Sequence, residues 1–256
     1  PMATDIAFAI GILSLLGNRV PTSLKVFLTA LAVIDDLGAI LVIAIFYTKT
    51  IAINNLLIAL GIWCLLLLFN RIKVRNLIPY LIGGIVMWYF MLHSGIHATI
   101  TGVLVAFAIP FGNGNKKSTS YILQDFLHAP VAFFILPLFA FANTCIPIAT
   151  HWTSSLLHEN SIGIISGLVI GKPLGIWLFS FLGTALGLCV LPNDLKWKNI
   201  LGAGFLGGIG FTMSIFITLL AFDTTEIIDT SKIAILVASL LAGSIGFIIL
   251  KLSFRK

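Results

Sequence analysis

Two adjacent carboxylates, Asp35 and Asp36, lie in the middle of an apolar stretch that runs from residue 23 to residue 47. A helix of this length crosses a hydrocarbon core of about 30 Å. An ionised Asp at that depth costs roughly 2.5–3.5 kcal/mol on insertion scales, and ionisable groups inside a membrane generally serve a function. Because neighbouring helix residues point about 100° apart, we expect two different roles. A buried pair held only by hydrogen bonds is the structural alternative.

Further polar groups stand in apolar surroundings: Thr4 and Asp5 in the leading stretch, and Lys172 beside Pro173. Because proline lacks an N–H group, it frees local carbonyls that could bind an ammonium. Lys172 therefore either compensates these carbonyls or helix ends, or pairs with Asp35 or Asp36. Burial disfavours the charged form of such groups, so they can exchange protons. If Na⁺ and H⁺ compete for one carboxylate, alternating exposure of that site couples the two ion flows.

Composition excludes a soluble globular domain. The chain is 59% hydrophobic and only 9% charged, with a mean hydropathy of +1.12, whereas soluble domains carry about 25% charged residues. The basic residues lie in short links rather than on one polar face, so we expect no nucleic-acid partner. Cys64, Cys145 and Cys189 have no metal-like spacing, which is typical of small core residues. The composition predicts a multi-pass membrane protein.

The apolar stretches predict one transmembrane domain over residues 1–256, all helical, because an open sheet cannot satisfy its backbone in lipid. The leading span, 3–17, is partial. The full spans are expected near residues 23–47, 53–70, 77–93, 96–112, 127–146, 162–188, 199–222 and 231–250. The chain starts inside an apolar stretch without a signal peptide, so we expect it to be part of a longer protein whose N-terminal part is absent here.

The charges of the links test this topology. If the link after the partial span is cytoplasmic, only Lys49 and Lys232 among the link cations fall outside. The inside set is then Arg19, Lys25, Arg71, Lys73, Arg75, Lys116, Lys117, Lys196, Lys198, Lys251, Arg255 and Lys256. This bias follows the positive-inside rule and predicts a cytoplasmic C-terminus.

A glycine-rich stretch interrupts the span at 199–222. It contains Gly207, Gly208 and Gly210, followed by Thr212. Such glycines fit close packing of neighbouring helices, and they also fit a helix broken at the midplane, as in transporters with ion sites. His97, at the start of the 96–112 span, can titrate near neutrality, although an interfacial histidine is commonly just solvated or hydrogen-bonded.

The sequence also resembles the NhaA family of sodium/proton antiporters along essentially its whole length. The resemblance rests on Ala-Thr-Asp-Ile-Ala-Phe at 3–8, Ala-Val-Ile-Asp-Asp-Leu-Gly-Ala-Ile at 32–40 and Ser-Gly-Ile-His-Ala-Thr at 94–99. It continues with Leu-Pro-Leu-Phe-Ala-Phe-Ala-Asn at 136–143, Gly-Lys-Pro-Leu-Gly at 171–175 and Gly-Ile-Gly-Phe-Thr-Met-Ser at 208–214. It implies an inverted-repeat fold with crossing discontinuous helices, of which the first three to four helices (about three and a half spans) are missing here.

The resemblance also implies roles for individual residues. Asp36 would be the main carboxylate that exchanges Na⁺ or Li⁺ for protons, with Asp35 beside it, either binding the ion or paired with Lys172. Thr4 and Asp5 would lie at the extended break of the leading helix.

The second break would be formed by Gly207, Gly208, Gly210 and Thr212, and the two breaks would cross near the site. Asp5 and Lys172 would then offset the partial charges of the half-helix ends. His97 occupies a position linked in the family to pH response. Gln124 and Asp125 stand where relatives carry Glu and His, which bears on the pH set point.

These implications define the expected function: exchange of cytoplasmic Na⁺ (or Li⁺) for external H⁺, without an enzymatic step or a cofactor. The expected location is the bacterial cytoplasmic (inner) membrane, with membrane lipids as surroundings and a homodimer as the assembly. A passive cation channel could use the same acids, but it would not explain Lys172 at the midplane, and another ion-coupled carrier is the remaining alternative. The motifs of an intramembrane aspartyl protease and of a prenyltransferase are missing from the sequence.

Overall fold

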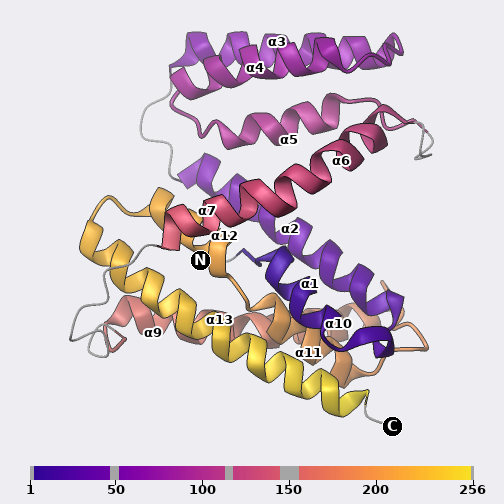
Figure 1. Ribbon diagram of the computed structural model, residues 1–256, viewed down its shortest axis with the longest axis vertical. Coiled ribbons are helices and arrows are strands. Elements are labelled where there is room, and N and C mark those ends of the chain that lie inside the picture. The colour runs from indigo at the N-terminus through magenta and orange to yellow at the C-terminus, as the bar shows by residue number, and fades with distance from the viewer. Residues whose placement is uncertain (1–2, 47–51, 113–117, 145–155, 255–256) are drawn as a thin grey trace. The chain divides into compact units, whose positions relative to one another are not determined.

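The computed structural model describes residues 3–46, 52–112, 118–144 and 156–254, and these ranges form helices without any β-strand (Figure 1). Four described helical segments are long and apolar enough to cross a membrane: Ile53–Arg71, Thr119–Thr144, Glu159–Ala185 and Thr225–Ser253. A fifth results if the bent pair Trp197–Gly207 and Phe211–Ala221 counts as one span. The predicted class, an all-α membrane protein with several spans, is confirmed. The individual span limits and the single transmembrane domain stay predictions.

The chain divides into two compact units, which are described separately. Unit 1 comprises residues 1–39 and 141–256, and unit 2 comprises residues 40–140. Unit 1 contains α1 (Ile6–Ser14), η1 (Gly17–Arg19), most of α2 (Thr22–Phe46), α9 (Glu159–Ser166), η3 (Gly167–Gly171), α10 (Lys172–Ala185), α11 (Trp197–Gly207), α12 (Phe211–Ala221) and α13 (Thr225–Ser253). All of the acidic and basic residues proposed above for ion binding lie in this unit.

Small residues let the helices of unit 1 approach closely. The α11 helix packs against both α10 and α13 (Figure 1). A Cβ added at Gly204 would lie 3.1 Å from the Cα of Pro173, and one added at Gly202 would lie 2.7 Å from the Leu250 side chain. Close packing of this kind replaces the hydrophobic driving force, which is absent between helices in lipid. The core of the unit includes Leu13, Leu24, Leu28, Leu206 and Leu250, and a second cluster includes Ile164, Leu168, Ile215 and Ile235.

Unit 2 contains the remaining helices. They are α3 (Ile53–Arg71), α4 (Ile78–His93), α5 (Thr99–Ala108), α6 (Thr119–Pro130), the π-helical segment η2 (Val131–Ile135) and the first part of α7 (Leu136–Thr144). The α3 and α4 helices pack against each other, and α5 contacts both of them. Their core is built around Leu66, Tyr80, Met87 and Met91. At 10 residues, α5 is about 15 Å long and so shorter than a membrane core.

Two π-helical segments occur in the same local context. Both η2 and η3 are followed by one residue and then a proline, Pro137 and Pro173 respectively. A proline inside a helix lacks an N–H group, and its ring clashes with the carbonyl four residues earlier. A π turn inserts one extra residue and relieves this conflict. As expected for a π turn, the N–H of Lys172 donates to the carbonyl of Gly167, five residues earlier in the chain.

Candidate functional site

The N-terminus of α1 is built on Asp5. Asp5 has an extended backbone, and its carboxylate accepts a hydrogen bond from the N–H of Phe8 at 3.1 Å, which caps the helix. The N–H of Asp5 donates to the carbonyl of Ile209 at 2.7 Å. The start of the chain therefore binds the backbone of a segment about two hundred residues later, and both ends of this contact are in unit 1.

The segment bound by Asp5 is a break between two helices. The α11 helix ends at Gly207, α12 begins at Phe211, and the two axes differ by 48°. The backbone of Gly208 has φ −73°, a value that any residue can adopt. A glycine is needed here because the neighbouring atoms leave no room for a side chain. A Cβ here would overlap with the carbonyl oxygen of Leu168 and lie 3.2 Å from the Cβ of Ala242. The broken helix is thus enclosed by η3 on one side and α13 on another.

One carboxylate binds the N-terminal ends of two helices. Besides capping α1, Asp5 accepts from the N–H of Thr212 at 3.1 Å and from the Thr212 hydroxyl. Asp5 is 3% exposed. Helix N-termini carry partial positive charge, which stabilises an anion placed between them. The charge of Asp5 is therefore balanced locally by α1 and α12.

Asp35 forms an ion pair with Lys172, and Thr4 contacts both residues. The Lys172 Nζ lies 2.7 Å from Asp35 Oδ2 and donates to the Thr4 hydroxyl at 2.6 Å. Thr4 Oγ1 is in turn 2.7 Å from Asp35 Oδ2 and 2.8 Å from the carbonyl oxygen of Gly207. Because a hydroxyl carries one proton, Thr4 donates to only one of these two acceptors at a time. Of the two roles that the sequence leaves open for Lys172, the structure has the pairing with Asp35.

Asp36 has a different environment, as the 100° spacing predicts. Its Oδ1 atom is buried, and within the described residues it has no hydrogen-bond partner. Buried polar atoms are almost always paired, so an exception of this kind indicates a place for a proton, a water molecule or an ion. The described residues contain no group of three His, Cys, Asp or Glu side chains close enough to hold a metal ion. Hydroxyl and carbonyl oxygens or water would complete the shell of a bound cation.

The predicted glycines and Thr212 lie at the break, whereas His97 does not. Gly207, Gly208 and Gly210 line the turn between α11 and α12, and Thr212 is in the first turn of α12. His97 belongs to unit 2 and lies two residues before the start of α5. Thr4, Asp5, Asp35, Lys172 and Thr212 are thus brought together, whereas His97 is not part of this group within unit 1.

A residue without any sequence signal also contributes to the break. Ser239 of α13 accepts hydrogen bonds from the N–H groups of Gly210 and Phe211, at 3.2 and 3.1 Å. Its sequence context, Val-Ala-Ser-Leu-Leu, is that of an ordinary apolar helix. Only the fold shows that its hydroxyl reaches α12.

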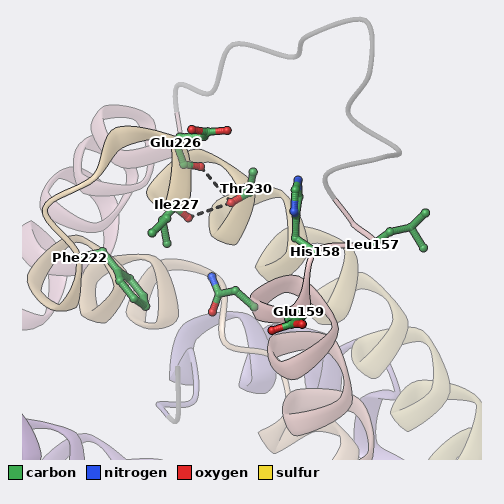
Figure 2. Close-up of a pocket in the computed structure, with 8 residues that line it drawn as sticks. Leu157, His158, Glu159, Phe222, Glu226, Ile227 and Thr230 are labelled. Carbon is green, nitrogen blue, oxygen red and sulfur yellow. Dashed lines mark hydrogen bonds between the residues drawn. The ribbon is translucent and has the colours of Figure 1, made fainter.

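Unit 1 also has a hollow of about 570 Å³ that contains none of these residues. Figure 2 shows it at the start of α9 and around the link between α12 and α13, with Glu159 and Glu226 among the labelled side chains. The Thr230 hydroxyl lies within hydrogen-bond distance of the carbonyls of Glu226 and Ile227, at 2.9 and 3.1 Å. Neither Asp35 nor Asp36 lines this hollow.

The apolar helices, and the broken helix whose Gly207 carbonyl is linked through Thr4 to the Asp35–Lys172 pair, define a polytopic membrane protein with a discontinuous helix. Comparison with known proteins agrees with this class. The chain belongs to the family described as Na⁺/H⁺ antiporter 1, which matches residues 1–250.

Similar proteins include Na(+)/H(+) antiporter NhaA 1 of Flavobacterium johnsoniae, 72% identical over 251 residues, which are 98% of this chain and 66% of that protein. The NhaA antiporter of Cytophaga hutchinsonii is 64% identical over 256 residues, 100% of this chain and 66% of its own length. That of Dechloromonas aromatica is 63% identical over 252 residues, 97% and 65% respectively. The chain thus spans slightly less than two thirds of the length of these curated relatives.

Proposed function

We propose that the intact protein exchanges cytoplasmic Na⁺ or Li⁺ for external H⁺ by alternating access, in the service of pH and sodium homeostasis. The observation that carries this proposal is the buried Asp36 Oδ1 without a hydrogen-bond partner among the described residues, beside the Asp35–Lys172 pair. A carboxylate oxygen that is desolvated but unpaired binds a proton or a cation, and it cannot bind both at once. The family and the names of the relatives support the choice of ions.

The roles of the two aspartates differ in this proposal. Asp36 is the principal ligand of the transported cation and the group that releases a proton when the cation binds. Asp35 contributes a second carboxylate, and its charge is paired with Lys172 at 2.7 Å. Binding of Na⁺ would then compete with this ion pair, so Lys172 assists release of the ion.

The supporting residues hold the site between the two breaks. Thr4 links Lys172, Asp35 and the carbonyl of Gly207, and Asp5 binds the N-termini of α1 and α12. Gly207, Gly208, Gly210 and Thr212 form the turn, which a continuous helix would not provide. His97 is proposed to contribute to the pH response.

The surroundings of the protein follow from the same proposal. The protein acts as a transporter rather than an enzyme, without a cofactor and without nucleic acid. It lies in the bacterial inner membrane among membrane lipids, with a cytoplasmic C-terminus, and it forms a homodimer when full length. A passive cation channel would leave the midplane ion pair of Lys172 unused, so it is the less favoured function.

The test uses the complete native protein in sealed liposomes with an internal pH dye. After a proton gradient is imposed, Na⁺, Li⁺ or K⁺ is added outside. We expect proton efflux with Na⁺ or Li⁺ but not with K⁺, and loss of this efflux in Asp36→Asn.

The matched control is Asp194→Asn, which makes the same chemical change at an exposed carboxylate whose partner is Ser23. It should retain the wild-type flux. Sodium flux that does not depend on protons would contradict antiport and indicate a channel.

A further inference from the structure

The start of α12 has no capping side chain of its own. The first backbone N–H groups of a helix lack partners within the helix and are usually capped by the residue at its N-terminus. Here that residue is Gly210, which has no side chain to do so. A Cβ at Gly210 would overlap with the hydroxyl of Ser214, so a serine or an aspartate at this position would not fit.

Two other helices supply the missing caps. Asp5, at the start of α1, accepts from the N–H of Thr212 at 3.1 Å. Ser239 of α13 accepts from the N–H groups of Gly210 and Phe211 at 3.2 and 3.1 Å. Three consecutive N–H groups of the break are thus bonded from α1 and α13.

The short serine side chain reaches the break because α13 packs very closely against it. A Cβ at Gly208 would lie 3.2 Å from the Cβ of Ala242, and one at Gly243 would lie 3.4 Å from the Ile209 side chain. Ser239 itself is 8% exposed. Because the hydroxyl and the two N–H groups meet at this close contact, the loss of Ser239 Oγ would remove the acceptor that both N–H groups use.

The geometry points to Ser239 as a positioning residue for ion exchange at the site of Asp35 and Asp36, a role that rests on the proposed function. Ser239 fixes Gly210 and Phe211, and the next residue, Thr212, binds Asp5. Asp5 is adjacent to Thr4, which contacts both Asp35 and Lys172. A displacement of the start of α12 is therefore transmitted to the ion pair over a few residues.

The experiment compares Ser239→Ala with Ser244→Ala in the complete native protein. Ser244 is exposed on the same helix, so this control makes the same chemical change away from the break. Amide hydrogen exchange is measured for a peptide that covers residues 208–214, and antiport is measured in liposomes as a function of Na⁺ concentration and pH.

For Ser239→Ala we expect exchange at Gly210 and Phe211 to be about tenfold faster, which corresponds to about 1.4 kcal/mol. The Na⁺ concentration for half-maximal antiport should rise several-fold with a shifted pH profile, and Ser239→Thr, which keeps a hydroxyl, should restore both. Ser244→Ala should match the wild type in every measurement.

Two results would overturn the assignment. Wild-type exchange in Ser239→Ala would show that the hydroxyl does not hold these N–H groups. Faster exchange with wild-type Na⁺ and pH dependence would show that Ser239 caps the helix without positioning the site. If Ser239→Ala does not fold, Ser239→Cys decides by the same criteria, because cysteine keeps the size but is a weak acceptor. Failure of wild-type antiport would instead count against the proposed function, since hydrogen exchange does not depend on it.

Discussion

Replacement of Gly208 by alanine adds one methyl group at a crowded point of the broken helix. The new Cβ would overlap with the carbonyl oxygen of Leu168 in η3 and lie 3.1 Å from the carbonyl of Phe205. On the α13 side it would lie 3.2 Å from the Cβ of Ala242. Two of these three neighbours are backbone atoms, which cannot rotate away as the end of a side chain can.

The expected cost follows from this crowding. Overpacking of a well-packed core costs about 1–3 kcal/mol. At roughly 2–4 °C per kcal/mol for proteins of this size, the midpoint of thermal unfolding in detergent should fall by about 2–12 °C. Because the φ of Gly208 is −73°, alanine is compatible with the backbone, and the cost arises from contacts alone.

The control for this prediction is Gly163→Ala in α9, where an added Cβ has no neighbour within 4 Å. Alanine favours a helix over glycine by up to about 1 kcal/mol, so this variant should be as stable as the wild type or slightly more stable. Thermal unfolding of both variants is followed by the loss of monodisperse protein after heating. Equal midpoints for Gly208→Ala and Gly163→Ala would refute the close approach of η3 and α13 to the break.

Three further predictions concern the site itself. Thr4→Val keeps the shape of the side chain but removes the hydroxyl that contacts Lys172 and Asp35. It should lower the free energy of unfolding by about 1–3 kcal/mol and raise the Na⁺ concentration for half-maximal antiport. An unchanged Na⁺ dependence would argue against this link. Asp5→Ala removes the carboxylate that caps α1 and α12, so hydrogen exchange at the start of both helices should accelerate. In Asp5→Asn, the amide oxygen can still accept these hydrogen bonds and should retain part of the protection. Equal exchange in the two variants would argue against capping. Lys172→Met removes the lysine partner of Asp35 and should destabilise the protein by about 3–5 kcal/mol. In the double variant with Asp35→Leu, most of that stability should return, but antiport should not. If the double variant recovers no stability, the two residues do not form a direct pair.

The helical class and the position of the break were accessible from the sequence. High hydropathy and basic links predict membrane helices, and Gly207, Gly208 and Gly210 predict a weak point where the structure has a bend of 48°. The glycines alone did not distinguish close packing from a break, and the structure has both, since Gly208 is enclosed by Leu168 and Ala242.

The partners of the site residues were not accessible, because they come from distant parts of the chain. Thr4 and Gly207 are 203 residues apart, and Asp5 and Thr212 are 207 apart. No local pattern encodes such contacts. The pairing of Lys172 with Asp35 stayed one of two alternatives until the fold was known, and Ser239 looks like any serine in an apolar helix.

In the proposed exchange, Na⁺ and H⁺ compete for the carboxylates of Asp36 and Asp35. The most direct measurement is the number of protons released when the purified complete protein binds Na⁺, recorded in weakly buffered solution by a pH indicator and by calorimetry. We expect proton release on addition of Na⁺ or Li⁺, none on addition of K⁺, and none in Asp36→Asn, with Asp194→Asn as the unchanged control. Binding of Na⁺ without proton release, or unaltered release in Asp36→Asn, would contradict competition of the two ions at Asp36.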